Sequence, residues 1–403
     1  MRYNTYGTAT IKSLVGLGVV ACTACAGDRD FSDDYGDVTV DTLRNGTIVV
    51  DNPSHGMWDS SSAWHVEEEL RIGTLEGSGP DLFGRISALE VDESGRLYVF
   101  ESQAQELRVF EASGSFVRTI GREGGGPGEF KEVIGLAWAP DGNLWVIDPG
   151  NVRISVFDTA GTYVTMKRIL GGYVMMPWPG RFDRAGRFYH YGLDLSEDGP
   201  GRFVMVRFDT LLQPLDTIRI PTPPENSYFE LRSEDGIVTA GIPYTASVTS
   251  RIGPAGHLWF ANTGDYRVYK RQVDGDTALI VSRDFEPLRV SSEEVDSAIA
   301  GLDWFTRQGG RIDRSRFPGL KPALNTLYVD DEDNLWVVPV TSLDESWRLL
   351  DVFESSGRYL GRVRLPFRLS AGPIPIIRGG FLFCVTADEF NVPYVIRARI
   401  VKP

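Results

Sequence analysis

Two stretches of the chain place aromatic, acidic and arginine side chains close together in the sequence. Aromatic rings and guanidinium groups often recognise carboxylates, sugars and peptides, because rings stack and arginines form paired hydrogen bonds. These stretches therefore predict a surface that binds an unknown small molecule, a glycan or a partner protein. The structural alternative is that the tryptophan anchors a helix while the arginines are solvated. The candidate ligand-binding residues are Tyr228, Glu230, Arg232, Trp304, Arg307 and Arg311.

The familiar catalytic motifs are absent from the sequence, so whether the chain is an enzyme stays open. A phosphate loop needs a lysine and a hydroxyl residue that lead into a helix, whereas the glycine run at 124–128 is followed by Glu129 and lies between expected strands. There is no GxSxG turn for a serine nucleophile. The four histidines show no metal-ligand spacing. His190 could reach the centre of the fold from its strand, although a packed or surface histidine is the plainer interpretation.

Acidic residues gather at 330–334, in the order Asp, Asp, Glu, Asp, with Asn last. A calcium loop of the EF-hand type needs a central glycine and a glutamate at its twelfth position, and both are missing. We interpret this segment as a hairpin turn. The sequence motifs by themselves predict no cofactor.

The N-terminal 21 residues resemble an export signal. They contain no acidic residue, carry Arg2 and Lys12, and end in an apolar run too short for a stable membrane-spanning helix. Residues 19–22 resemble a bacterial lipobox, in which Cys22 would be lipidated and become the mature N-terminus. We therefore expect an exported, membrane-anchored lipoprotein that is periplasmic or associated with the outer membrane. The alternatives are an ordinary cleaved signal, or a disordered N-terminus with accidental cysteines; Cys25 is a poorer second match.

The net charge and the cysteine nearest the C-terminus argue against two classes of function. The chain has 41 basic and 55 acidic residues, a formal net charge of -14, and the acidic groups are scattered. No basic stripe for nucleic acid is visible, so we expect no nucleic-acid partner. Cys384 lies in an apolar stretch, which favours a buried structural thiol over a nucleophile.

One strand pattern occurs six times, each time after a turn. The equivalent residues are Leu97, Leu144, Phe188, Leu258, Leu335 and Phe381. Their spacings are 47, 44, 70, 77 and 46 residues, so two intervals carry inserts. Such a period predicts an all-β fold built from six four-stranded antiparallel units. The 44 glycines and 23 prolines suit its many turns.

The unit at 121–157 resembles an NHL repeat, the blade, roughly forty residues long, of a family of β-propellers. The matching segments are GGGPGEF at 124–130, PDGNLWV at 140–146 and DPGNVRISVF at 148–157. The resemblance is tight for about residues 86–165 and looser elsewhere. It implies a six-bladed β-propeller of the sort found among exported or lipid-anchored bacterial proteins. Asp148, Asn151 and Arg153 match the DxGNxR signature of the repeat, which we interpret as framework.

The resemblance leaves two functional hypotheses. The first is an extracytoplasmic, lipid-anchored propeller that acts as a ligand-binding or protein-interaction scaffold through the face that carries the inserts. The second follows from related propellers, which include lactone hydrolases and lyases with a divalent metal held in the central channel by carboxylates, Asn or His. It would make this chain a metal-dependent hydrolase or lyase, with calcium as the possible metal.

The expected domains are a signal peptide at 1–21, a tether at 22–63 with one strand at 46–51, and the propeller at 64–403. The tether is either free or partly pinned against the propeller. The last repeat offers only three strands, while residues 66–73 read as a lone strand. We therefore expect the N-terminal strand to complete the C-terminal blade and close the ring.

Inserts are expected at 221–243 and 291–320. Each joins the outer strand of one blade to the inner strand of the next, so both should flank the fourth blade on one face. Ser291 and Glu294 form a capping box before the one short helix. Val295, Ile299, Leu302 and Phe305 follow at helical spacing, and we expect this apolar side to lie on the propeller.

Overall fold

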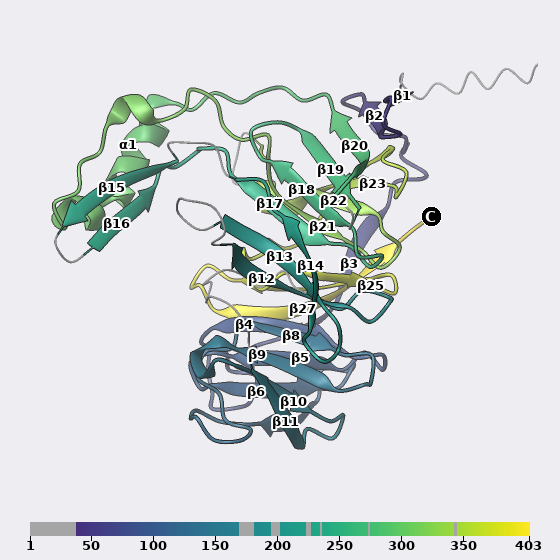
Figure 1. Cartoon of the computed structure of the whole chain (residues 1–403), viewed down its shortest axis with the longest axis vertical. Coiled ribbons are helices and arrows are strands. Elements are labelled where there is room, and N and C mark those ends of the chain that lie inside the picture. The colour runs from purple at the N-terminus through teal and green to yellow at the C-terminus, as the bar shows by residue number, and fades with distance from the viewer. Residues whose placement is uncertain are drawn as a thin grey trace, which may run out of the picture. The chain divides into compact units, whose positions relative to one another are not determined.

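A computed structural model describes residues 38–168, 181–194, 202–222, 227–233, 236–272, 275–341 and 345–403. Cys22 and the expected signal peptide lie outside these ranges. Figure 1 shows the described strands gathered in separate, mostly antiparallel sheets.

The first two sheets follow the repeat pattern closely. Each begins with an inner strand and adds its further strands outward in sequence order. Glycines at the tight turns have positive φ, such as +84° at Gly95 and +80° at Gly142, which other residues adopt only with strain. The strands are β4 (Ile86–Val91), β5 (Leu97–Glu101), β6 (Glu106–Phe110), β7 (Phe116–Ile120), β8 (Gly135–Trp138), β9 (Leu144–Asp148), β10 (Arg153–Phe157) and β11 (Tyr163–Arg168).

The next three sheets keep the same order. In the third, three strands lie in the described ranges, and a bridge from Phe182 to Phe188 marks where the innermost segment meets them. The strands are β12 (Phe188–Asp194), β13 (Arg202–Phe208), β14 (Pro214–Arg219), β17 (Val248–Ile252), β18 (Leu258–Asn262), β19 (Arg267–Arg271), β20 (Thr277–Arg283), β21 (Leu324–Val329), β22 (Leu335–Pro339), β23 (Leu349–Phe353) and β24 (Tyr359–Arg364).

The sixth sheet joins the two ends of the repeat array. It consists of β25 (Ile376–Arg378), β26 (Phe381–Ala387), β27 (Pro393–Val401) and β3 (His65–Ile72). β3 pairs antiparallel with β27, so that Val66 lies opposite Ile400 and Ile72 opposite Val395. The expected closing strand is therefore confirmed. The fold is an all-β six-bladed propeller.

Buried side chains pack between neighbouring blades. Trp145 of the second blade contacts Phe188 of the third with ring centroids 5.1 Å apart. Trp259 and Trp336 occupy the same place in the fourth and fifth blades, and each packs against the following blade. Burial of one such side chain contributes about 1.5–3 kcal/mol. The blades are therefore held side by side chiefly by large apolar groups.

The DxGNxR signature holds the glycine-rich connector in place. The carboxylate of Asp148 accepts hydrogen bonds from the backbone amides of Lys131 and Glu132, and Asn151 donates to the carbonyl of Gly124. Arg153 donates to three carbonyls of the same connector. These contacts give the three residues a structural role, as expected. The glycine run is an inter-blade connector.

Residues 38–63 differ from a free tether. β1 (Thr39–Thr42) and β2 (Ile48–Asn52) extend the fourth blade outward, and β2 pairs in parallel with β20. Val50 is buried in the core between the fourth and fifth blades. The side chain of Asn52 donates to the carbonyls of Ser282 and Gly357. This part of the expected tether is therefore docked on the fold.

The two inserts form one small substructure. The first contains a hairpin of β15 (Tyr228–Ser233) and β16 (Gly236–Gly241), and the second contains α1 (Ser292–Gly301) and α2 (Asp303–Arg307). The capping box is confirmed, because Ser291 Oγ accepts from the Glu294 amide at 3.2 Å and Glu294 Oε2 accepts from the Ser291 amide at 3.0 Å. Three short 3-10 helices complete the described elements: Pro149–Asn151, Arg314–Arg316 and Ser346–Arg348.

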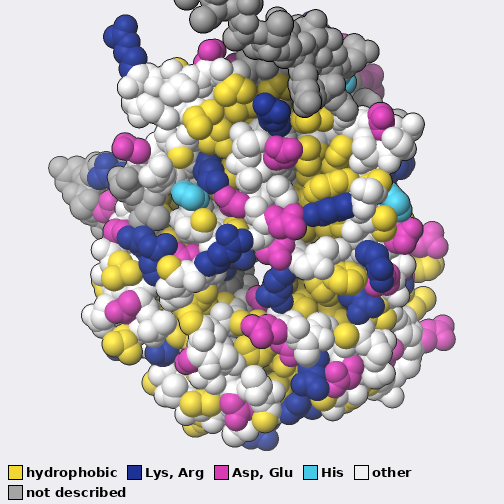
Figure 2. Space-filling model, turned by 90° about the vertical axis from the view of Figure 1, so that its right-hand side faces the viewer, with side chains coloured by type: hydrophobic (Ala, Val, Ile, Leu, Met, Phe, Trp, Pro, Cys, Tyr) yellow, Lys and Arg dark blue, Asp and Glu magenta, His cyan; other side chains and the backbone are white. Residues whose placement is uncertain are grey.

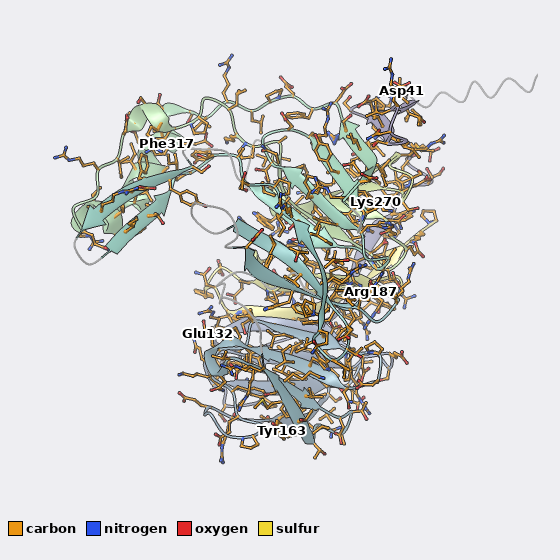
Figure 3. All side chains as sticks on the ribbon, in the orientation of Figure 1. Asp41, Glu132, Tyr163, Arg187, Lys270 and Phe317 are labelled. Carbon is orange, nitrogen blue, oxygen red and sulfur yellow. The ribbon has the colours of Figure 1, made fainter. Side chains whose placement is uncertain are left out.

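The expected contact between the helix and the propeller is wrong. Leu302 and Phe305 are buried against the hairpin, in one cluster with Phe229, Ala240 and Ile242. Phe317, which Figure 3 labels beside these elements, adds a ring contact to Phe229 with centroids 6.0 Å apart. The hairpin offers the helix an apolar partner that helical periodicity cannot identify, so the two inserts bury each other.

Candidate ligand site in the central channel

The inner strands of the six blades converge on a cavity of about 200 Å³. Neighbouring inner strands lie side by side, as with β4 and β8 and with β17 and β21. Each blade starts with its inner strand and then turns back, so these strands end at the same face of a propeller. One side chain from the late part of each innermost segment lines the cavity: Glu90, Trp138, Arg181, Arg251, Tyr328 and Arg378.

The charge of this cavity is opposite in sign to that of the chain. Its charged lining residues are the arginines 181, 251 and 378 and the carboxylates Glu90 and Asp331, which gives a formal charge of +1 from three positive and two negative groups. The whole chain has a formal charge of -14. Figure 2 shows Lys and Arg together with Asp and Glu side chains around a hollow near the middle of the face that it displays. The channel therefore concentrates positive charge in an acidic protein.

Arg251 has no carboxylate partner among the described residues. Its Nη1 donates to the Ser250 carbonyl at 2.7 Å and its Nη2 to Thr326 Oγ1 at 3.1 Å, while Nε has no hydrogen-bond partner among the described residues. The guanidinium lies over the ring of Tyr328, 5.7 Å from its centroid. Burial lowers the pKa of Arg251, and no carboxylate opposes that shift. Neutral groups alone thus contact this partly buried cation.

Glu90 belongs to a second polar group in the channel. Burial raises the pKa of its carboxyl, while the nearby Arg378 and Arg181 act in the opposite direction. Glu90 Oε1 accepts from the Val91 amide at 2.9 Å, and Arg378 donates to the Val91 carbonyl. Burial lowers the pKa of Arg181, because it disfavours the charged guanidinium, while the carboxylates of Glu90 and Asp331 act in the opposite direction. Opposite charges therefore balance one another here, unlike at Arg251.

A divalent cation fits this channel poorly. Calcium prefers six to eight oxygen ligands, several of them carboxylates, and the described lining offers two carboxylates beside three guanidinium groups. Within the described ranges no three His, Cys, Asp or Glu residues are grouped to hold a metal ion. His190 is buried on β12 and is not among the residues that line the cavity. Asp330 of the acidic segment accepts hydrogen bonds within its own hairpin turn.

The six candidates on the inserts lie outside the channel cavity. Tyr228, Glu230 and Arg232 alternate along β15 with residues that pack on the helical segment, so they face away from Trp304, Arg307 and Arg311. Glu230 pairs with Arg232 at 3.0 Å and Arg307 with Asp303 at 2.8 Å, all four being exposed. The Trp304 ring meets the edge of Phe305 and is 42% exposed. Tyr228 and Arg311 are exposed as well. These side chains form open surfaces with local charge pairs, and their role in binding stays a prediction.

Sequence motifs do not predict the channel residues, because these residues share no motif. Glu90 and Arg251 each interrupt an otherwise apolar or small-residue inner strand shortly before its turn. Once the repeat has identified an inner strand, a charged residue near the end of that strand is the sequence signal that would have predicted these channel residues. Cys384, in contrast, is fully buried, and burial raises the pKa of its thiol, which argues against a nucleophile.

Comparison with known proteins supports the fold. A family model described as a six-bladed β-propeller, DUF5128, matches residues 72–169. A candidate exported protein of Bacteroides fragilis NCTC 9343 is similar in structure over 88% of this chain and 100% of its own, with a TM-score of 0.50 and 13% sequence identity. At this identity the likeness shows the fold alone. No curated protein sequence matches the chain significantly.

Two enzymes have a weaker structural likeness. Virginiamycin B lyase of Staphylococcus aureus has a TM-score of 0.43 and 10% identity, over 84% of this chain and 100% of its own. A gluconolactonase of Xanthomonas campestris has a TM-score of 0.39 and 12% identity, over 76% of this chain and 83% of its own. Likeness at this level carries no argument about activity. In the described part of the chain, no helix has the length and apolar character needed to cross a membrane.

Proposed function

We propose that this chain is an exported, lipid-anchored, NHL-like β-propeller that binds a small molecule in its central channel. The cavity described above carries this proposal, because it combines a central position with one polar or aromatic side chain from each of six blades. Apolar walls with a few convergent polar groups are typical of ligand sites. The insert surface is open and self-paired, so it supports a binding role less well.

Binding suits the channel better than catalysis. Arginines do not act as proton acceptors at ordinary pH. The one serine in the lining, Ser87, donates its hydroxyl hydrogen to the Val133 carbonyl at 2.7 Å, and no base activates it. The described lining thus offers recognition groups, while the carboxylate of Glu90 accepts a hydrogen bond from the Val91 amide and contacts no hydroxyl or thiol of the described residues that it could activate.

A thermal-shift screen of small metabolites followed by two variants tests this proposal. Tyr328→Leu changes the channel wall, while joint deletion of 227–242 and 291–320 removes the insert surface. We expect the shift produced by hits to be lost in the first variant and kept in the second. The opposite pattern, with both variants folded, would transfer the binding function to the inserts.

Metal analysis of the purified protein separates binding from the metal-dependent alternative. We expect no retained calcium or zinc and no rise in Tm when either is added. Stoichiometric metal would favour the hydrolase or lyase hypothesis.

The lipid anchor is supported by residues 19–22 and by the export pattern of residues 1–21. Cys22→Ser should release the protein from the membrane fraction of cells, because the lipid would be attached through the cysteine sulfur, which serine lacks. Continued membrane association of that variant would exclude lipidation at Cys22.

A further inference from the structure

We propose that the channel ligand carries an oxyanionic group, a carboxylate or a phosphate, and that Arg251 is the residue that binds it. This inference rests on the proposed binding function and names the class of ligand. It concerns one end of the ligand, the oxyanion, which would bind the guanidinium of Arg251. That guanidinium lies over the ring of Tyr328 and donates to the hydroxyl of Thr326.

The first argument is the unbalanced charge of Arg251. A guanidinium has five N–H donors, and the described partners of Arg251 are one carbonyl and one hydroxyl, both neutral. A buried ion without a counter-charge is costly unless other groups compensate for its lost hydration. Arg283, in contrast, has that compensation from Asp351 at 2.7 Å. Arg251 is therefore a cation that an anionic ligand would complete.

The second argument is the set of neighbours around Arg251. Thr249 and Thr326 lie in adjacent inner strands, and their hydroxyl oxygens are 3.0 Å apart. Neither threonine is among the residues that line the cavity, so these hydroxyls hold the guanidinium in place and do not contact the ligand. The two carboxylates of the lining influence Arg181 and not Arg251. An anion at Arg251 thus avoids the negative charges of the channel.

The third argument is the size and remaining lining of the cavity. About 200 Å³ is room for a small organic molecule, and Ile252, Ile374 and Pro375 supply apolar wall. Glu90, Arg181 and Arg378 offer further polar contacts. The geometry therefore suits a small organic acid or phosphate ester better than a bare inorganic ion.

Sulfate, phosphate and acetate are suitable probes because each presents only the oxyanion. Isothermal titration at constant ionic strength should show saturable binding of at least one of them to the wild type. Arg251→Gln should weaken this binding about tenfold or more, since a hydrogen bond to a charged group is lost. Arg251→Lys should retain part of it. Arg232→Gln, which changes an arginine of the insert surface, is the matched control and should bind as the wild type does.

A stability measurement distinguishes this role from a structural one. Without added anions, Arg251→Gln should have a Tm equal to or above that of the wild type, because an uncompensated buried charge is removed. An arginine kept for structural pairing would instead lower the Tm when replaced. If Arg251→Gln does not fold, Thr326→Val provides a second variant, since it removes only the hydroxyl that contacts Nη2.

Two outcomes would overturn the inference. One is the absence of saturable binding of all three probes to the wild type, and the other is unchanged affinity in Arg251→Gln. Neutral or cationic hits whose binding depends on Tyr328 would keep the proposed function while rejecting the oxyanion. If no ligand binds in the channel, both the proposed function and the oxyanionic ligand are rejected.

Discussion

Asp351 is a fully buried carboxylate that joins the fourth and fifth blades. It accepts hydrogen bonds from Tyr266 at 2.5 Å and from Arg283 at 2.7 Å, both of the fourth blade, and from Tyr359 and Arg362 of its own blade. Replacing one partner of a buried ion pair leaves the other charge uncompensated and costs about 3–5 kcal/mol. The rigid junction of these two blades thus depends on one negative charge.

Asp351→Asn should therefore lower the free energy of unfolding by about 3 kcal/mol, since partial exposure of Arg362 places the loss at the lower end. Urea unfolding measures the change. Asp41→Asn is the matched control, because Asp41 lies exposed on β1 (Figure 3) and should shift stability by less than about 0.5 kcal/mol. Equal effects of the two substitutions would contradict the role of Asp351.

His190 makes stability depend on pH. Burial lowers its pKa from 6.5 to about 4 in the folded protein. When the pH falls from 6.5 to 4, the unfolded chain takes up a proton that the folded protein refuses, so unfolding becomes more favourable. The loss is about 1.4 kcal/mol per pH unit at most, or on the order of 2–3 kcal/mol over this window.

His190→Gln should remove that part of the pH dependence. Stability from urea unfolding at several pH values between 4 and 7 should fall less steeply in the variant than in the wild type. Other groups titrate equally in both proteins, so the difference isolates His190. Parallel curves would show that His190 does not resist protonation.

At the scale of elements, the two inserts depend on each other. Phe229 of the hairpin is 2% exposed and Phe305 of the helical segment is fully buried, and they share one cluster. Deleting 291–320 alone should uncover the hairpin and lose burial worth about 1.5–3 kcal/mol for each large side chain. We expect aggregation of that variant in size-exclusion chromatography.

Joint deletion of 227–242 and 291–320, each replaced by a short Gly-Ser linker, should give a soluble monomer. The blades have their own cores, since the cluster of the inserts is separate from those between blades. A soluble single deletion, or an insoluble double one, would show that the helix packs on the blades after all.

The repeat made most of the fold predictable, while the inserts and the channel were harder. β9 begins at Leu144 and β22 at Leu335, which are two of the equivalent residues of the repeat, because Gly, Asp and Asn turns precede these strands. The hairpin of β15 and β16 lies outside the repeat, so no register predicted it. The apolar side of α1 indicated that this side is buried, but not against which element. In the sequence, Arg251 resembles an ordinary charged strand residue. Only the closed ring of blades determines which side chains face the central axis.

Composition left open whether residues 22–63 are pinned against the propeller, and it could not identify the partners of β2. Asn52 accepts from the Tyr359 amide at 2.8 Å and donates to the Gly357 carbonyl at 3.0 Å, both in the fifth blade, while β2 itself pairs with the fourth. Asn52→Ala leaves these buried backbone groups unpaired, which costs about 1–3 kcal/mol each. Hydrogen exchange should show faster exchange at Ile48–Asn52 in the variant. Unchanged protection would mean that backbone pairing with β20 suffices.

At the scale of the whole molecule, ring closure links the first repeat to the last. β3 covers the outer edge of β27, with Val66 and Ile72 buried in the cores on its two sides. An uncovered edge of this length exposes backbone donors and acceptors that can pair with another chain. Loss of the two side chains from the core costs about 3–6 kcal/mol in addition.

A chain that begins at residue 74 should therefore have a lower Tm than one that begins at residue 64, and it should associate through β27 in light-scattering measurements. The longer chain keeps β3 and, like the shorter one, lacks β1 and β2, so it serves as the control. Adding a peptide of residues 65–72 in excess should restore the monomer, because it supplies the missing strand in the same register. A monomeric short chain of unchanged Tm would show that the ring holds without its closing strand, and that the cores between blades alone keep the channel walls together.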